Sequence, residues 1–227
     1  MRERIVGIGK DNRAEGYIAD CLSEKEIDFE KECDNSFVYF RIYDPEDTVE
    51  SLVSDVIVTY YKFGEIYRLL IPDGVCTYPY CAYIGSVMSI DADLERRQIK
   101  SLIPSDKMIN IDGIYNFCLP KIRESWESLA ILCKKLVAQC KTEKDMYSLT
   151  SFMLGVENDT ESTLTVDRQE KITLKKNGQQ INLPILFGNP EMDAIATILA
   201  NSPSEIVILK KEAFSEEFMD LMRKIGI

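Results

Sequence analysis

The chain has 227 residues, of which 45% are hydrophobic and 29% are charged, and its formal net charge is -11. This length and composition suffice for one large domain or two small ones that bury a core without disulfide or metal staples. The absence of histidine excludes Ser/His/Asp and Cys/His triads, imidazole-ligated zinc and histidine acid–base catalysis. Because the negative charge repels phosphate backbones and anionic lipids, we expect neither a general nucleic-acid nor a membrane-surface role.

Seven cysteines are scattered along the chain, and an odd number in this pattern does not indicate a disulfide framework. The first residues, from Met1 to Ile5, lack the apolar core of a secretory signal peptide. No stretch has the roughly 18 to 20 apolar residues that span a bilayer. The nearest, from Val75 to Ile90, contains Pro79 and several polar residues. We therefore expect a cytoplasmic protein whose cysteines are thiols.

The N-terminal segment predicts a β-α-β-β unit. Ile5 to Ile8 is apolar and predicts a strand, and Asn12 is placed to cap a helix that runs to about Glu24. Residues 28–43 have extended, aromatic-rich character, interrupted at Asp34-Asn35. We interpret this interruption as a hairpin turn between two strands.

The middle of the chain predicts helices. Apolar residues recur at helical spacing from Val49 to Phe63, after a start at residues 45–48 and before an end near residues 72–74. A second helical stretch runs from about Tyr80 to Ile103, with a break near Asp91.

A long helix begins at Pro120, where a proline is tolerated because the first turn needs no N–H donor. Thr142 and Asp145 form a capping signal for a further helix that ends near Leu154, and residues 157–161 predict an acidic loop. The apolar stripe of the long helix consists of Ile122, Trp126, Leu129, Cys133, Leu136 and Cys140.

The C-terminal part begins with a predicted β-hairpin. Residues 162–166 and 171–183 alternate apolar and polar positions, and Asn177-Gly178 is the preferred dipeptide of a type I′ turn. Asn189 and Pro190 then mark the start of a helix. A strand over residues 205–209 and a helix over residues 214–225 complete the chain.

These elements predict an α+β protein with a mostly helical middle, an N-terminal β-α-β-β unit and a C-terminal hairpin, helix, strand and helix. If the chain has a domain boundary, it lies near Pro104 and Ser105. It would separate residues 1–104, an α/β and helical part, from residues 105–227. The alternative is one continuous domain.

Gly7-Ile8-Gly9-Lys10 follows a strand and precedes a helix, which is the setting of a phosphate-binding loop. The P-loop spacing is absent, and Asn12 stands where a dinucleotide-binding fingerprint has its third glycine. We interpret the segment as a simple strand-to-helix turn.

The spacing of Cys76 and Cys81 would allow both thiolates to reach one metal ion, but no second cysteine pair or histidine nearby completes a tetrahedral site. Two buried thiols explain them better. Asp91, Asp93 and Glu95 form a carboxylate cluster of the kind that holds magnesium. Asp159 and Glu161 form a second cluster of the same kind. Solvated helix-terminal acids are the simpler account. We therefore predict no metal site, no cofactor and no catalytic residues.

Basic residues outnumber acidic ones along the long helix, where the candidate ligand-binding residues are Lys121, Arg123, Lys134 and Lys135. The hairpin adds Arg168, Lys171, Lys175 and Lys176. If helix and hairpin share one face, this patch would bind a phosphate-bearing ligand or an acidic partner. Ordinary solubilising lysines are the alternative.

The segment from Ile109 to Phe117, leading into the long helix, resembles the YtxC-like sporulation proteins of spore-forming Firmicutes. Residues 143–154 resemble that family's following helix, and residues 192–209 resemble its C-terminal helix and strand. The resemblance covers about residues 105–210. It implies a cytoplasmic protein linked to sporulation, and it implies no catalytic residues because none are established for that family.

The leading hypothesis is therefore a non-enzymatic accessory or protein-interaction protein with a protein partner. The alternative is a small-molecule-binding or carboxylate-dependent hydrolytic enzyme that uses Asp91 and Asp93 in a pocket. A third hypothesis, nucleic-acid binding through the face from Lys121 to Lys144, conflicts with the overall charge.

Overall fold

The computed structural model describes residues 2–10, 12–44, 48–71, 76–156 and 159–225. The chain forms two compact units, each built from segments that are distant in the sequence. The first unit comprises Met1–Gly64 and Ala92–Trp126, and the second comprises Glu65–Asp91 and Glu127–Ile227. The chain thus passes between the units three times. This grouping differs from the predicted division near Pro104.

Each unit combines helices with a four-stranded mixed sheet, so the predicted α+β class is confirmed. In the first unit the strand order is β2-β3-β1-β4, with β1 and β4 parallel and the other neighbours antiparallel. The strands are β1 (Arg2–Gly9), β2 (Phe29–Cys33), β3 (Phe37–Asp44) and β4 (Met108–Asn110).

Most helices of the first unit lie between these strands in the order of the chain. The predicted β-α-β-β start is confirmed, whereas β4 was not predicted. The elements are α1 (Ala14–Glu24), α2 (Thr48–Val56), the π-helix η1 (Ile57–Tyr61), α5 (Ala92–Leu102), α6 (Ile111–Gly113) and the π-helix η2 (Ile114–Cys118). Two helices begin in this unit and continue into the second, α3 (Lys62–Leu70) and α7 (Pro120–Val137).

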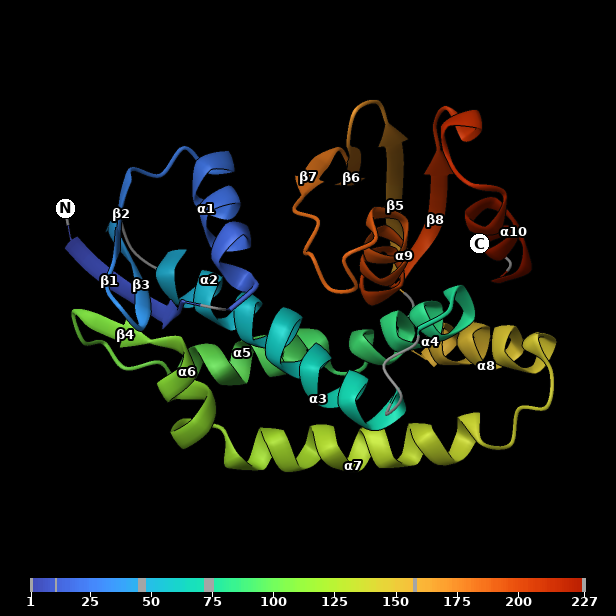
Figure 1. Cartoon of the computed structure of the whole chain (residues 1–227), viewed down its shortest axis with the longest axis horizontal. Coiled ribbons are helices and arrows are strands. Elements are labelled where there is room, and N and C mark those ends of the chain that lie inside the picture. The colour runs from blue at the N-terminus through green and yellow to red at the C-terminus, as the bar shows by residue number, and fades with distance from the viewer. Residues whose placement is uncertain (1, 11, 45–47, 72–75, 157–158, 226–227) are drawn as a thin grey trace. The chain divides into compact units, whose positions relative to one another are not determined.

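The core of the first unit lies on one face of its sheet. Successive side chains of a strand point to opposite faces, and one set of alternate residues on β1 and β3 is buried against α1 and α2 (Figure 1). This set consists of Val6, Ile8, Val38, Phe40 and Ile42, none of them more than 1% exposed. The other face is therefore left for polar and half-buried residues.

A buried ion pair joins three helices of the first unit. The Lys62 side chain is fully buried, and its Nζ donates to Glu95 Oε2 at 2.7 Å. The other oxygen of Glu95 accepts from the indole Nε1 of Trp126, also at 2.7 Å. A buried charge is tolerated only when it is paired and hydrogen-bonded, so the three side chains fix the relative positions of α3, α5 and α7 within this unit.

The predicted helix over about residues 48–71 contains a π-helical turn, η1, between α2 and α3. Its predicted start at residues 45–47 and end at residues 72–74 lie outside the described residues. The break near Asp91 is confirmed, because α4 (Tyr78–Ser89) ends before it and Asp91 has a φ of 55°.

In the second unit the strand order is β7-β6-β5-β8, with β5 and β8 parallel. The strands are β5 (Asp159–Arg168), β6 (Ile172–Lys176), β7 (Gln179–Ile181) and β8 (Pro203–Ile208). Besides α4 and parts of α3 and α7, its helices are α8 (Glu143–Val156), α9 (Pro190–Ala200), the 3-10 helix η3 (Lys211–Ala213) and α10 (Glu216–Ile225). Helix α9 packs against both the sheet and α4.

One turn and two helix caps that were predicted from the sequence are confirmed in the second unit. Asn177 and Gly178 both have positive φ, at 51° and 82°, as a type I′ turn requires. Asn189 accepts from the backbone N–H groups of two residues in the first turn of α9. Thr142 and Asp145 exchange hydrogen bonds as a capping pair. The predicted acidic loop is wrong for residues 159–161, because β5 begins at Asp159.

Helices α4 and α9 cross closely at a glycine. A Cβ built on Gly85 would lie 2.8 Å from both Cα and the carbonyl oxygen of Ala196. Because these are backbone atoms, a side chain at residue 85 would have to push the two helices apart. Gly155 in α8 offers the opposite case, since a Cβ there would meet nothing within 4 Å.

We expect Glu95→Leu to destabilise the first unit by about 3 to 5 kcal/mol, because it removes the carboxylate to which the buried Lys62 and Trp126 donate. Trp126 is the only tryptophan, so its fluorescence during urea unfolding monitors this unit. Glu124→Leu, at an exposed position of α7, is the control and should change the stability by less than about 0.5 kcal/mol. A loss below about 1 kcal/mol for Glu95→Leu would contradict this account.

The same substitution should have opposite effects at two glycines of the second unit. Gly85→Ala is expected to destabilise by about 1 to 3 kcal/mol through overpacking of α4 against α9. Gly155→Ala is expected to be neutral or to stabilise by up to about 1 kcal/mol, because alanine restricts the unfolded chain and favours helix. Urea unfolding followed by circular dichroism measures both. Equal effects would show that α4 and α9 do not meet at Gly85.

Candidate functional site

Figure 1 shows α1 and α2 on one face of the first sheet. The opposite face carries a row of large side chains. On β3 this row consists of Phe37, Tyr39, Arg41 and Tyr43, all of them half-buried. They alternate with the buried core residues of the same strand, so the pleat of β3 projects them to the opposite side. We call this surface, together with its neighbours on β1, β2 and β4, the open face.

Small and apolar residues of β1 lie beside the aromatic side chains. Gly7 is the cross-strand partner of Tyr39, and a Cβ built on it would lie 3.2 Å from two atoms of the Tyr39 ring. The Tyr39 ring therefore lies over the bare backbone at Gly7. The rings of Phe37 and Tyr39 are 6.1 Å apart and tilted. Ile5 and Met108 extend the apolar area toward β4, where Met108 is 53% exposed.

Carboxylates outnumber cations on the open face. Arg41 contacts three of them: it pairs closely with Glu3, its Nη2 lies 3.4 Å from Glu32, and its Nε lies 3.7 Å from Glu30. Lys107 donates to the second oxygen of Glu3 at 2.7 Å. The side chains of Glu30 and Glu32 are each 62% exposed. They share one guanidinium, so this side of the face stays negative.

Asp34 holds the turn that leads into β3. Its Oδ1 accepts from the backbone N–H groups of Ser36 and Phe37, both at 2.7 Å, and its Oδ2 accepts from the Tyr39 hydroxyl at 3.0 Å. The two backbone N–H groups hold the pKa of the Asp34 carboxyl below its usual value. The hydrogen bond to Asp34 raises the pKa of Tyr39, so the phenol stays neutral and its ring remains anchored at one edge.

A second polar cluster lies at the carboxyl ends of the parallel strands β1 and β4. Asp112 accepts from the Gly9 backbone N–H at 2.8 Å and from the Tyr61 hydroxyl at 2.5 Å. Asn12 donates to the same hydroxyl at 3.0 Å. In a phosphate-binding loop the amide of Gly9 would face the ligand, whereas here it binds the protein's own carboxylate. The segment from Gly7 to Lys10 thus works as a strand-to-helix turn.

The predicted basic residues of the long helix do not all lie on one side of α7. At about 100° per residue, Lys121 and Lys135 project to one side, and Arg123 and Lys134 project to the opposite side. The guanidinium of Arg123 lies 4.6 Å from the centre of the Tyr115 ring, whereas the three lysines are exposed. Ligand binding by these four residues stays a prediction.

Within the second unit, the hairpin and the C-terminal half of α7 do not share a single positive face. Within the second unit, Figure 1 shows them on opposite sides, with α9 and α4 between them. Arg168 is bound to Glu191, whose buried carboxylate also accepts from Tyr78 at 2.9 Å and from the Ser215 backbone N–H at 3.0 Å. Burial by itself would raise the pKa of the Glu191 carboxyl, but these hydrogen bonds lower it more, so the pKa lies below its usual value. The cluster joins β5, α4, α9 and α10.

Of the two cysteines considered as metal ligands, Cys81 is buried as predicted and Cys76 is half-buried. Burial raises the pKa of Cys76 to about 12, and burial likewise raises that of Cys81. The Cys81 thiol donates to the Met192 carbonyl oxygen at 2.9 Å. Both thiols are therefore protonated at neutral pH.

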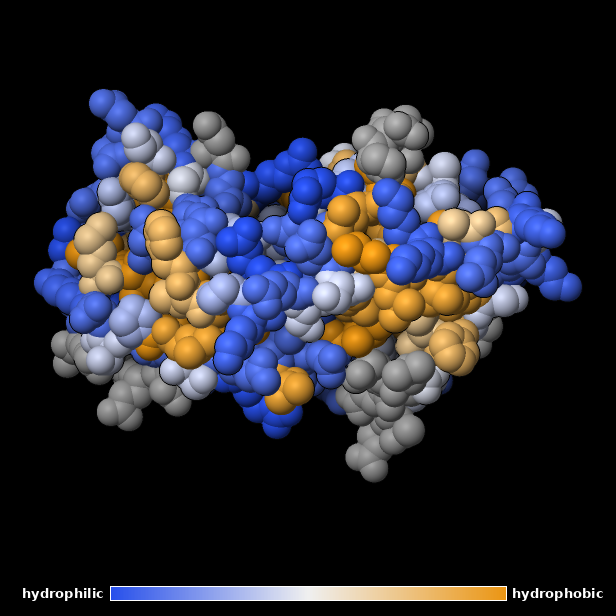
Figure 2. Space-filling model, turned by 90° about the horizontal axis from the view of Figure 1, so that it is seen from below, coloured by the Kyte–Doolittle hydropathy of each residue, from blue (hydrophilic) through white to orange (hydrophobic). Residues whose placement is uncertain are grey.

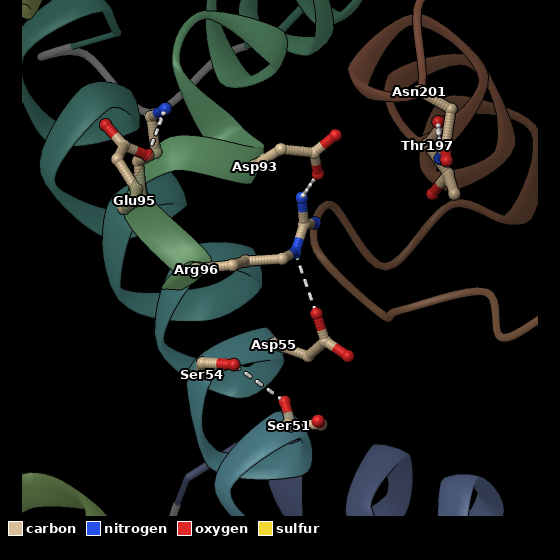
Figure 3. Close-up of polar contacts among 9 residues, drawn as sticks. Ser51, Ser54, Asp55, Asp93, Glu95, Arg96, Thr197 and Asn201 are labelled. Carbon is tan, nitrogen blue, oxygen red and sulfur yellow. Dashed lines mark hydrogen bonds and ion pairs between the residues drawn. The ribbon is translucent and has the colours of Figure 1, made fainter. Parts of the chain in front are cut away.

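The carboxylates near Asp91 do not converge. Asp91 is exposed, and the Asp93 side chain is 93% exposed and paired with Arg96, which also binds Asp55 (Figure 3). Glu95 points to the other side of α5 in that view, toward its partner in the core. No group of three or more Cys, Asp or Glu side chains among the described residues is placed to hold a metal ion.

Other apolar side chains are exposed in the second unit, on α7 and α8. Ile131, Leu132 and Phe152 are 42%, 55% and 67% exposed. Figure 2 views the molecule from the side of α7 and shows orange surface in this unit, broken by blue hydrophilic side chains. The described part of this area lacks the regular row of aromatic residues that marks the open face.

The open face was missed from the sequence, although a signal for it is present. Residues 37–43 are nearly all apolar or aromatic, so the alternation that separates a buried face from an exposed one is weak. The single Arg41 and the hydroxyls of Tyr39 and Tyr43 fall on alternate positions, and they indicate which face is exposed.

None of the described helices is long and apolar enough to cross a lipid bilayer. Comparison of the chain with protein-family models, with curated proteins and with solved structures found no match. The resemblance to the YtxC-like family therefore remains an expectation.

We expect the Asp34 turn to lose its contribution to stability in acid. The folded pKa lies below the unfolded value of about 3.9, so the contribution is present above the unfolded pKa and is lost as pH falls through the folded pKa. The urea midpoint of Asp34→Ala should lie below that of the wild type at pH 7, and the difference should shrink near pH 2. Asp34→Asn keeps an acceptor oxygen and should lose less at pH 7. A difference that is constant with pH would contradict this account.

Proposed function

We propose that the protein is a non-enzymatic accessory protein that binds a protein partner through the open face of its first unit. The observation that carries this proposal is the row of Phe37, Tyr39, Arg41 and Tyr43 on one side of β3. These side chains are neither buried in the core nor fully solvated. They present a flat surface that is already ordered by the sheet.

The residue types on this face are those that dominate protein interfaces. Tyr, Phe, Met and Arg are enriched at interface centres, and Tyr and Arg are common among the residues that supply most of the binding energy. The open face has an aromatic and apolar centre around Tyr39, Ile5 and Met108, and its charged residues lie beside that centre. Tyr39 is held by Gly7 and Asp34, so little conformational entropy is lost when a partner binds.

The biological setting belongs to the same proposal. The resemblance of residues 109–117, 143–154 and 192–209 to YtxC-like proteins suggests an accessory role in sporulation. Deletion of the gene from a spore-forming host should then lower the yield of heat-resistant spores, and an unchanged yield would contradict this setting.

The binding surface can be tested before the partner is known. Extended peptides would be selected from a random library on the full-length protein, and their dissociation constants measured by fluorescence anisotropy. We expect Tyr39→Ser with Tyr43→Ser to weaken the selected peptides about tenfold to a hundredfold, as the loss of one or two anchoring side chains does.

The control is Phe152→Ser, which removes an exposed aromatic side chain from α8 and should leave the affinity unchanged. Circular dichroism confirms that each variant is folded. Selected peptides that bind the double variant as well as the wild type, or that lose affinity only with Phe152→Ser, would contradict the open face as the binding surface.

A further inference from the structure

We infer that the open face selects an extended, basic segment of its partner, with two Lys or Arg side chains four residues apart. This inference rests on the proposed function and specifies the chemistry of the partner. It follows from two pairs of side chains on the open face. Each pair consists of a tyrosine ring on β3 and a carboxylate on β2.

The first pair is Tyr39 with Glu32, which are direct cross-strand partners. The second is Tyr43 with Glu30, which lies diagonally across from it and whose charge helps to raise the pKa of Tyr43, after burial. Tyr39 and Tyr43 are four residues apart on one strand, which corresponds to about 13 Å along the sheet. An extended peptide of the same pitch projects residues i and i+4 from one side at the same spacing.

Each pair suits a cation. A Lys or Arg head group placed over a tyrosine ring is attracted by the ring's negative face, and a carboxylate at the ring's edge adds an ion pair. Glu30 and Glu32 keep room to accept from a ligand, because both are 62% exposed and lie 3.7 and 3.4 Å from the Arg41 nitrogens.

The charge around the pairs favours a basic segment over an acidic one. The open face and its turn carry the carboxylates Glu3, Glu30, Glu32 and Asp34. Opposing them are Arg41, Lys107 and also Lys10, whose Nζ lies 3.4 Å from the Asp34 carbonyl oxygen, so four negative charges meet three positive ones. The formal charge of the whole chain is -11. A single-stranded nucleic acid would also stack on the aromatic rings, but it needs a positively charged groove.

The test uses three peptides on the full-length protein, with affinities measured by fluorescence anisotropy. The first is Thr-Val-Lys-Thr-Val-Thr-Lys-Val-Thr, with its lysines four residues apart on one side of an extended chain. In the second, both lysines are replaced by glutamine. In the third, one lysine is moved by a single position, which sends it to the opposite side of the strand.

We expect the first peptide to bind about tenfold more tightly than either of the others, and its affinity to fall as salt is raised. Glu30→Gln with Glu32→Gln should abolish this preference. The control, Glu124→Gln with Glu127→Gln, makes the same change of charge at exposed positions of α7 and should preserve it.

Equal binding of the lysine and glutamine peptides at the open face would overturn this inference but leave the proposed function intact. Equal binding of the first and third peptides would overturn the four-residue spacing. Loss of the preference in the α7 control would show that only the total charge matters. Single-stranded DNA is the alternative ligand of the open face. This would be shown if it bound more tightly than the first peptide and lost this affinity in Tyr39→Ser with Tyr43→Ser, and it would overturn the inference.

Discussion

The first unit depends on one buried interaction, the contact of Lys62 with Glu95 and of Glu95 with Trp126. Each of these residues lies within four positions of a point where the chain passes between the units, after Gly64, after Asp91 and after Trp126. The ion pair therefore holds together the three chain segments that continue into the second unit. Apolar packing alone tolerates small shifts, whereas a fully buried ammonium requires its carboxylate at one position. This requirement fixes the relative positions of α3, α5 and α7 within the first unit.

The two faces of the first sheet show how one strand serves both stability and recognition. Val38, Phe40 and Ile42 fill the core, and the residues between them form the open face. A rigid sheet is a good support for recognition because its backbone hydrogen bonds are already made and its side chains have few remaining rotamers. The lack of a side chain at Gly7 weakens the strand locally, but the Tyr39 ring covers the gap. Gly7, a residue type that ordinarily weakens a strand, thus positions Tyr39 at the centre of the open face.

The sequence was most informative where local chemistry determines local structure. The turn at Asn177-Gly178, the cap at Asn189 and the pair of Thr142 with Asp145 were all predicted and are confirmed, since each depends on neighbouring residues only. Strand β4 was missed because its three residues form a strand only by pairing with β1, and η1 was missed because a π-helical turn leaves the apolar spacing nearly helical. The open face was missed because β3 is apolar on both sides. The basic residues of α7 showed the opposite difficulty: they are close in sequence, but helix periodicity divides them between two sides.

The threefold passage of the chain between the units has a consequence for the order of synthesis. Every residue of the first unit has been made once the ribosome reaches Trp126, at which point only residues 65–91 of the second unit exist. Those residues include the apolar helix α4, whose packing partners α8 and α9 are still to be translated. The first unit can therefore complete its core while α4 has none, and this helix is the segment that a chaperone would shield during translation. A fragment that ends after α7 would keep that exposed helix permanently.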